Sequence, residues 1–128
     1  MLKQNLMIRT NLLLADNFPI SIYGYINILT NQNHHYKPID FTTAYSCEEA
    51  YLKITKRFLS QKTLNLVFLD ISLPSYQSKN LYTSNDLAKL IKIYFSACKI
   101  ILLTMHNEPI AITRAIQEIN PKGFILEK

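Results

Sequence analysis

The sequence predicts an α/β domain built on a parallel β-sheet, and three observations support this prediction. Five short apolar runs occur along the 128 residues, and most of them do not alternate between apolar and polar residues. Strands that are covered on both faces, as in a parallel sheet, have this pattern. Stretches with helical spacing of apolar residues separate the runs, so strand and helix alternate as in an α/β fold. The length fits a single domain.

The five predicted strands are short and rich in leucine or β-branched residues. They cover residues 8–16, 40–46, 64–70, 98–104 and 123–128. The third contains the sequence LVFLD, in which an uninterrupted apolar run leads directly into Asp70. A carboxylate at that position raises the question of why a buried strand should end on an acid.

Four helices are predicted between these strands, at residues 19–30, 46–60, 85–97 and 107–119. The second begins with Ser46 and Glu49, a spacing that is typical of a capping box. The fourth has Pro109 in its first turn, where the missing N–H group costs nothing. The predicted order is therefore β-α-β-α-β-α-β-α-β, without repeats or linkers.

Composition narrows the class of protein. Apolar residues make up 48% of the chain, which is enough for a full core. The sequence contains no uninterrupted run of about 18 apolar residues, the length that a membrane-spanning helix needs. The amino-terminal apolar stretch is interrupted by Asp16 where a signal-peptide cleavage site would lie, so we expect a cytoplasmic protein. The net charge is +5, but the lysines are scattered, which favours solvated helix faces over a nucleic-acid surface.

Polar residues close three of the predicted strands: Asp16 the first, Asp70 the third and Thr104 the fourth. In open α/β sheets, ligands bind at the carboxyl ends of the strands. If these strands are neighbours, the three side chains converge at the rim of the sheet, where a carboxylate is not buried in the core. Two adjacent carboxylates repel each other, so a cation is the natural third group.

The sequence resembles the receiver domain of bacterial two-component response regulators. The resemblance rests on LLLADNFP, LVFLDISLP, KIILLTMH and NPKGFILEK, which occur in order over nearly the whole chain. It implies a flavodoxin-like fold, in which helices sandwich a five-stranded parallel sheet of order 2-1-3-4-5. It also implies that residues 1–128 form one receiver domain, trimmed before the family's fifth helix and lacking any output domain.

The resemblance also assigns roles. Asp70 would accept a phosphoryl group from a histidine kinase or a phosphotransfer protein, which suits a carboxylate nucleophile. Asp16 and Asn17 would hold Mg²⁺ together with Asp70 and the backbone carbonyl of Ser72, in keeping with the preference of magnesium for oxygen ligands.

Two further roles follow from the same resemblance. Thr104 would contact the phosphoryl group, and Phe124 would change position when the group is present. The resemblance implies homodimers among the partners, a role in transcription regulation and contact with DNA only through an output domain that this chain lacks. No contact with a membrane is expected.

Two positions depart from the pattern of the family. Asn17 stands where a second acid is usual, so we expect Mg²⁺ to bind weakly. Glu127 occupies the position of the usual lysine, and Lys128 comes one residue later. Because side chains alternate along a strand, Lys128 would point away from the site unless a bulge corrects the register.

Two functional classes therefore remain open, and neither is a classical enzyme. The first is a phosphoryl-accepting switch, which the two aspartates and Thr104 favour. The second is a degenerate, phosphorylation-independent receiver that acts as a protein-interaction or dimerisation module, which the two departures favour. We prefer the first. A flavin or nucleotide enzyme of similar shape is disfavoured because the chain has only two glycines and no glycine-rich phosphate loop.

Overall fold

The computed structural model describes residues 9–31, 38–105 and 109–127. Five parallel strands form one sheet in the order β2-β1-β3-β4-β5, which confirms the predicted fold class. The strands are β1 (Thr10–Ala15), β2 (Ile39–Ala44), β3 (Leu66–Asp70), β4 (Lys99–Met105) and β5 (Gly123–Glu127). The helices are α1 (Pro19–Asn31), α2 (Cys47–Leu59), η2 (Gln77–Lys79), α3 (Ser84–Tyr94) and α4 (Pro109–Ile119).

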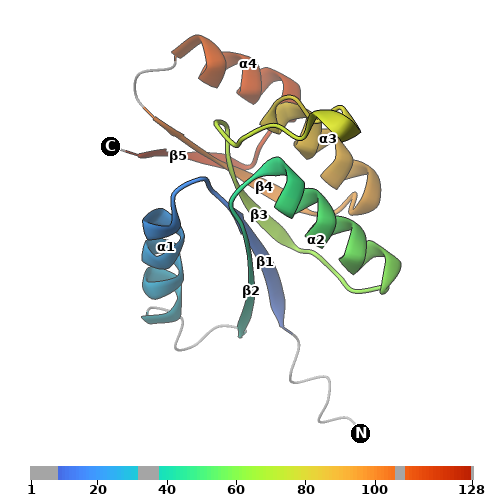
Figure 1. The fold of residues 1–128 in the computed structure, drawn as a ribbon. Coiled ribbons are helices and arrows are strands. Elements are labelled where there is room, and N and C mark those ends of the chain that lie inside the picture. The colour runs from blue at the N-terminus through green and yellow to red at the C-terminus, as the bar shows by residue number, and fades with distance from the viewer. Residues whose placement is uncertain (1–8, 32–37, 106–108, 128) are drawn as a thin grey trace, which may run out of the picture.

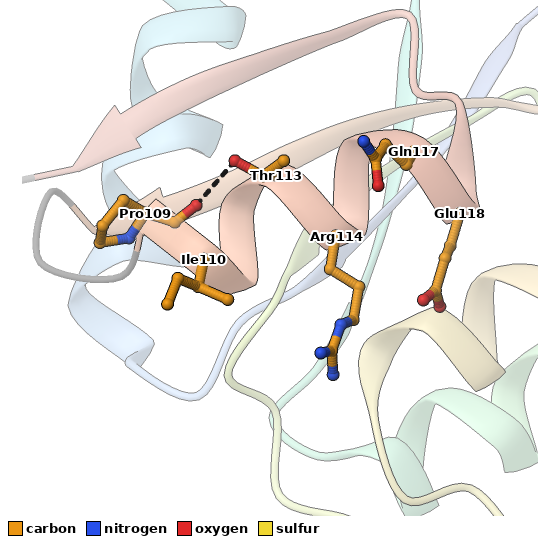
Figure 2. Close-up of a pocket in the computed structure, with 6 residues that line it drawn as sticks. All are labelled: Pro109, Ile110, Thr113, Arg114, Gln117 and Glu118. Atoms are coloured by element: carbon orange, nitrogen blue, oxygen red, sulfur yellow. Dashed lines mark hydrogen bonds between the residues drawn. The ribbon is translucent and has the colours of Figure 1, made fainter.

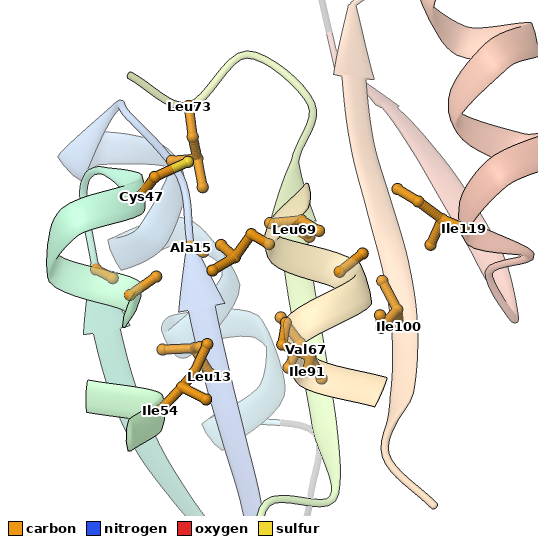
Figure 3. Close-up of a cluster of buried hydrophobic side chains, with 14 of the residues drawn as sticks. Leu13, Ala15, Cys47, Ile54, Val67, Leu69, Leu73, Ile91, Ile100 and Ile119 are labelled. Carbon is orange, nitrogen blue, oxygen red and sulfur yellow. The ribbon is translucent and has the colours of Figure 1, made fainter. Parts of the chain in front are cut away.

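The helices form two unequal layers around the sheet (Figure 1). Helices α2, α3 and α4 pack on one face, where they bury a large apolar cluster with alternate residues of the central strands. Figure 3 shows this cluster around Leu13, Val67, Leu69 and Ile100. Among the helices of the described residues, only α1 packs on the opposite face, through Ile22 and a smaller cluster. Both faces of β1 and β3 are therefore covered, as their uninterrupted apolar sequences predict.

Local sequence signals explain where the helices begin. The Ser46 hydroxyl accepts a hydrogen bond from the Glu49 N–H at 3.1 Å, as predicted, but the Glu49 carboxylate accepts from Tyr45 N–H instead of Ser46 N–H. Helix α3 begins with a full capping box formed by Thr83 and Asp86, which was not predicted. It ends at Tyr94 instead of 97.

The long segment before α3 has a compact structure of its own. Its chain makes one turn of 3-10 helix, and Asn80 adopts a left-handed conformation with φ of 59°. An antiparallel bridge joins Tyr76 to Leu81, and Leu81 is buried. Within the part of the chain that the structure describes, no helix is long and apolar enough to cross a membrane.

The core offers a matched pair of leucines for a test of stability. Leu13 is 1% exposed, whereas Leu52 on α2 is 52% exposed. We expect Leu13→Ala to lower the free energy of unfolding by about 2–5 kcal/mol, because it removes buried surface and leaves a cavity. Leu52→Ala should change it by about 0.5 kcal/mol or less. Urea denaturation followed by circular dichroism measures both, and equal losses would contradict the placement of Leu13 in the core.

Candidate functional site

The parallel register brings two aspartates together at the carboxyl end of the sheet. Ala15 pairs with Leu69 between β1 and β3, so Asp16 and Asp70 are the next residues of neighbouring strands. Both side chains are shielded from solvent: Asp16 is 0% exposed and Asp70 is 4% exposed. Neither aspartate belongs to the apolar clusters of the core, and their shielding from solvent at the rim was not predicted.

Backbone N–H groups hold the Asp70 carboxylate in place. Ser72 N–H donates to Oδ1 at 2.9 Å, and Asn17 N–H donates to Oδ2 at 3.4 Å. The Ser84 hydroxyl donates to the backbone carbonyl of Asp70 at 2.5 Å, which ties the start of α3 to the end of β3. The carboxylate of Asp70 is therefore oriented by the loops that follow two different strands. The two N–H groups that donate to it, those of Ser72 and Asn17, carry no net charge.

The Asp16 carboxylate is only partly satisfied. Its Oδ1 atom accepts a hydrogen bond from Phe18 N–H at 2.9 Å, but its buried Oδ2 atom has no hydrogen-bond partner among the described residues. Burial raises the pKa of Asp16 to about 7, and the charges of Asp70 and Glu127 contribute to that rise. The hydrogen bond from Phe18 opposes the rise but does not cancel it.

Thr104 lies on β4, next to the strand of Asp70, and Phe124 lies on the edge strand β5 beyond it. Asp70 pairs with Leu103 of β4, and Thr104 is the next residue along that strand. Thr104 is buried, and its hydroxyl donates to the carbonyl of Met105 at 3.4 Å. Phe124 pairs with Leu102 and is 50% exposed on the edge strand β5. Phe124 is therefore an accessible aromatic side chain near the rim, not a core residue.

Glu127 faces the aspartates. The pairing of β5 with β4 runs without a bulge up to Met105 opposite Glu127. By alternation, Glu127 lies on the same face as Ile125, which packs in the α1-side cluster. Its negative charge raises the pKa of Asp16, which places the two carboxylates within electrostatic reach. Lys128, the alternative cation, lies outside the described residues.

Sequence reasoning missed Tyr25 as a member of this site. Its hydroxyl donates to Glu127 Oε2 at 2.6 Å, and its ring packs edge-on against Phe68 with centroids 5.5 Å apart. Burial raises its pKa, and so do the hydrogen bond and the charge of Glu127, so the phenol remains a donor at neutral pH. The available signal was a tyrosine within the apolar stripe of α1, next to Ile22 and Ile26.

The oxygen atoms at the rim suit a divalent cation of the magnesium type. The carboxyl group of Asp16, which has one oxygen atom without a partner, interacts with that of Asp70. Mg²⁺ is commonly bound through one or two carboxylates with several waters retained. The residues that the structure describes contain no group of three or more His, Cys, Asp or Glu side chains arranged as a metal site. The fit is therefore that of a two-carboxylate site, not of a closed protein cage.

A hollow of about 470 Å³ lies elsewhere, on the outer surface of α4 (Figure 2). It is lined by Pro109, Ile110, Thr113, Arg114, Gln117 and Glu118. The Thr113 hydroxyl donates to the Pro109 carbonyl, and Glu118 accepts from Asn85 of α3. Since the lining comes from one helix and these polar groups are satisfied within the protein, it is a surface concavity separate from the acidic rim.

Comparison with solved structures identifies the fold. A CheY-like response regulator receiver domain protein from Methanospirillum hungatei JF-1 matches with a TM-score of 0.69 and 17% identity, over 94% of this chain and 82% of that one. RcsB from Salmonella enterica serovar Typhimurium, bound to the promoter rprA with the phosphomimetic BeF3-, matches with a TM-score of 0.67 and 22% identity, over 93% and 87%.

A third match is a response regulator from Burkholderia pseudomallei with a phosphorylated aspartic acid, a calcium ion and citrate. Its TM-score is 0.66 and its identity 13%, over 92% of this chain and 59% of that one. No protein-family model matches the sequence, and no curated protein matches it. The chain has the fold of response-regulator receiver domains.

The raised pKa of Asp16 predicts how stability depends on pH. An unfolded aspartate releases its proton near pH 3.8, whereas folded Asp16 keeps it to about pH 7. Between these values the folded state binds more protons, so stability falls as pH rises, by at most about 1.4 kcal/mol for each pH unit. Asp16→Asn should remove this decline in metal-free buffer, and urea denaturation at pH 5 and pH 8 measures the difference. A stability difference between the two proteins that is the same at both pH values would contradict the assignment.

Proposed function

We propose that this chain is a receiver module that accepts a phosphoryl group on Asp70 and thereby controls an output. The observation that carries the proposal is the placement of Asp70: its carboxylate ends the central strand, is oriented by two backbone N–H groups and interacts with the carboxyl group of Asp16. One solved structure of the same fold, the response regulator from Burkholderia pseudomallei, contains a phosphorylated aspartic acid.

The residues of the rim suit attack by a carboxylate on phosphorus. One oxygen of Asp70 would form the new P–O bond, while the bond between phosphorus and the donor's leaving atom breaks and its electron pair leaves with the donor. The N–H groups of Ser72 and Asn17 hold the nucleophile in one orientation before transfer. The Thr104 hydroxyl is one residue from the register partner of Asp70 and could donate to a phosphoryl oxygen.

Asp16 and Asp70, with the amide oxygen of Asn17 and the carbonyl of Ser72, would hold Mg²⁺. The ion would neutralise charge on the phosphoryl oxygens. One acid fewer than in the usual set predicts weak binding. The donor would be a histidine kinase or a phosphotransfer protein, and dimerisation is a reasonable accompaniment because a neighbour of the same fold, RcsB, is seen as two dimers bound to DNA.

The second candidate is a phosphorylation-independent interaction module, and one observation favours it. Glu127 places a third carboxylate near Asp16 in a site that has to accept further negative charge. In the ranges 9–31, 38–105 and 109–127, the one ion pair joins Arg9 to Asp40, so no cation there is paired with the rim. This arrangement opposes a stable acyl phosphate.

Phosphoryl transfer to Asp70 can be tested by mass. Incubation of the wild-type protein with acetyl phosphate and Mg²⁺ should add about 80 Da, the mass of one phosphoryl group, to the intact protein. Asp70→Asn should abolish the gain, and a chelator should reduce it. Asp40→Asn is a control for loss of an aspartate at the opposite end of the sheet. Labelling that persists in Asp70→Asn would refute the assignment, and no labelling at any donor concentration would support the interaction module.

The charge at position 127 should set the extent of phosphorylation. A charge about 5 Å from the phosphoryl group contributes on the order of 3 kcal/mol at an effective dielectric constant of about 20, before screening by solvent and metal. Glu127→Lys should therefore raise the fraction phosphorylated by acetyl phosphate, and Glu127→Gln should raise it less.

Two controls separate charge from position. Tyr25→Phe removes the hydrogen bond to Glu127 while keeping its charge, so it should leave the phosphorylated fraction nearer to that of the wild type. If Glu127→Lys changes nothing while Lys128→Ala lowers phosphorylation, Lys128 supplies the cation, and the module is an ordinary receiver.

A further inference from the structure

Four basic side chains gather around one hollow between β2 and the carboxyl-terminal half of α2. The hollow measures about 230 Å³ and is lined by Thr42, Lys53, Lys56, Arg57, Ser60 and Lys62. An adjoining hollow of about 510 Å³ shares three of these residues and extends to Asn11, Asp40 and Thr63 near the amino ends of β1 and β2. Three of the lysines that are scattered along the sequence, and one arginine, therefore lie together at one place in the fold.

The local charge is strongly positive. Residues 50–69 contain four basic residues and no acid. Asp40 is the one carboxylate in the lining of the two hollows, and the Arg9 guanidinium pairs with it at 2.6 Å. That ion pair offsets the negative charge of Asp40, so an anion in the hollow would meet four cations without a competing free carboxylate.

Two of the cations are already held in place. Lys53 Nζ donates to the backbone carbonyl of Thr43, and Arg57 Nε donates to that of Thr63 at 2.9 Å. An ammonium has three N–H donors and a guanidinium five, so both groups retain donors for a ligand. Because these side chains are oriented before binding, less conformational entropy is lost when an anion arrives.

Helix stability explains only part of this arrangement. Lys56 and Arg57 lie in the last turn of α2, where cations interact favourably with the helix dipole. Lys62 follows the helix and Lys53 precedes its last turn, so the dipole does not account for either of them. The Thr42 and Ser60 hydroxyls add neutral donors to the same hollow.

We propose that this hollow binds the phosphate chain of a small polyphosphate, either inorganic or part of a nucleotide. Arginine binds phosphate through two parallel hydrogen bonds, and lysine binds it as a point charge. Nucleic-acid backbones are instead followed by cations spread along a groove.

The polyphosphate hollow is separate from the acidic rim. The rim follows the carboxyl ends of β1 and β3, whereas the adjoining hollow reaches Asn11 and Asp40 at the amino ends of β1 and β2. Binding there does not require Asp70 or a metal. The proposal therefore stands or falls independently of phosphoryl transfer.

The test is titration of the whole chain with inorganic tripolyphosphate, in a chelator-containing buffer at about 0.15 M salt, where charges more than about 8 Å apart are screened. Calorimetry should detect binding, and amide NMR shifts should centre on residue 42 and residues 53–62. The double variant Lys56→Gln/Lys62→Gln should weaken binding at least about tenfold. Lys89→Gln/Lys122→Gln removes the same charge elsewhere and should leave affinity within about twofold. Circular dichroism checks that both variants are folded.

Further ligands distinguish the source of the phosphate. Equal affinity for tripolyphosphate and ATP, with none for adenosine, indicates recognition of the phosphate chain alone. Tighter binding of ATP indicates a nucleotide, and both results support the proposal. It is overturned if the two double variants lose affinity equally, if the NMR shifts centre on Asp16 and Asp70, or if duplex DNA binds while tripolyphosphate does not.

Discussion

The in-register parallel pairing of β1, β3 and β4 is the constraint on which the rest of the structure depends. Hydrogen bonding aligns Ala15 with Leu69 and Asp70 with Leu103, so the first polar residues after three apolar strands arrive at one edge. Helices cover both faces of β1 and β3. A polar side chain in the middle of these strands would be buried without hydrogen-bond partners, which is unfavourable, so the polar side chains lie at the strand ends. The position of the acidic pair is thus a consequence of sheet register and two-sided burial.

Burial makes the negative charges at this edge of the sheet unfavourable. Asp16 is fully buried and has an oxygen atom without a partner, and the nearby acids raise its pKa further. Either a proton or the proposed cation would relieve this repulsion. Glu127 adds to the negative potential, while its hydrogen bond from Tyr25 ties the last strand to α1. If Asp70 accepts a phosphoryl group as proposed, the charge of Glu127 would oppose its retention unless a cation were present.

The two ends of the sheet carry opposite charge. The carboxyl end has a buried acidic rim, and the region around α2 and the amino ends of β1 and β2 has four basic side chains around a hollow. This separation of charge is compatible with the two proposed sites, one for a cation and one for an anion, because the sites would not compete directly. It also means that the net charge of +5 does not describe either site.

The sequence by itself determined the alternation of strands and helices, the approximate limits of each element and the polar residues at the strand ends. These follow from periodicity and capping, which are local and visible in a single sequence. Alternation along the last strand also predicted that Glu127 lies on the face toward the aspartates unless a bulge shifts the register.

Only the tertiary structure decided that Asp16 and Asp70 are buried, that Tyr25 reaches Glu127 across 102 positions of the chain, and that Lys53 and Lys62 share a hollow. Burial and long-range contacts depend on how loops and helices far apart in sequence pack together, and side-chain spacing along one segment carries no information about that packing.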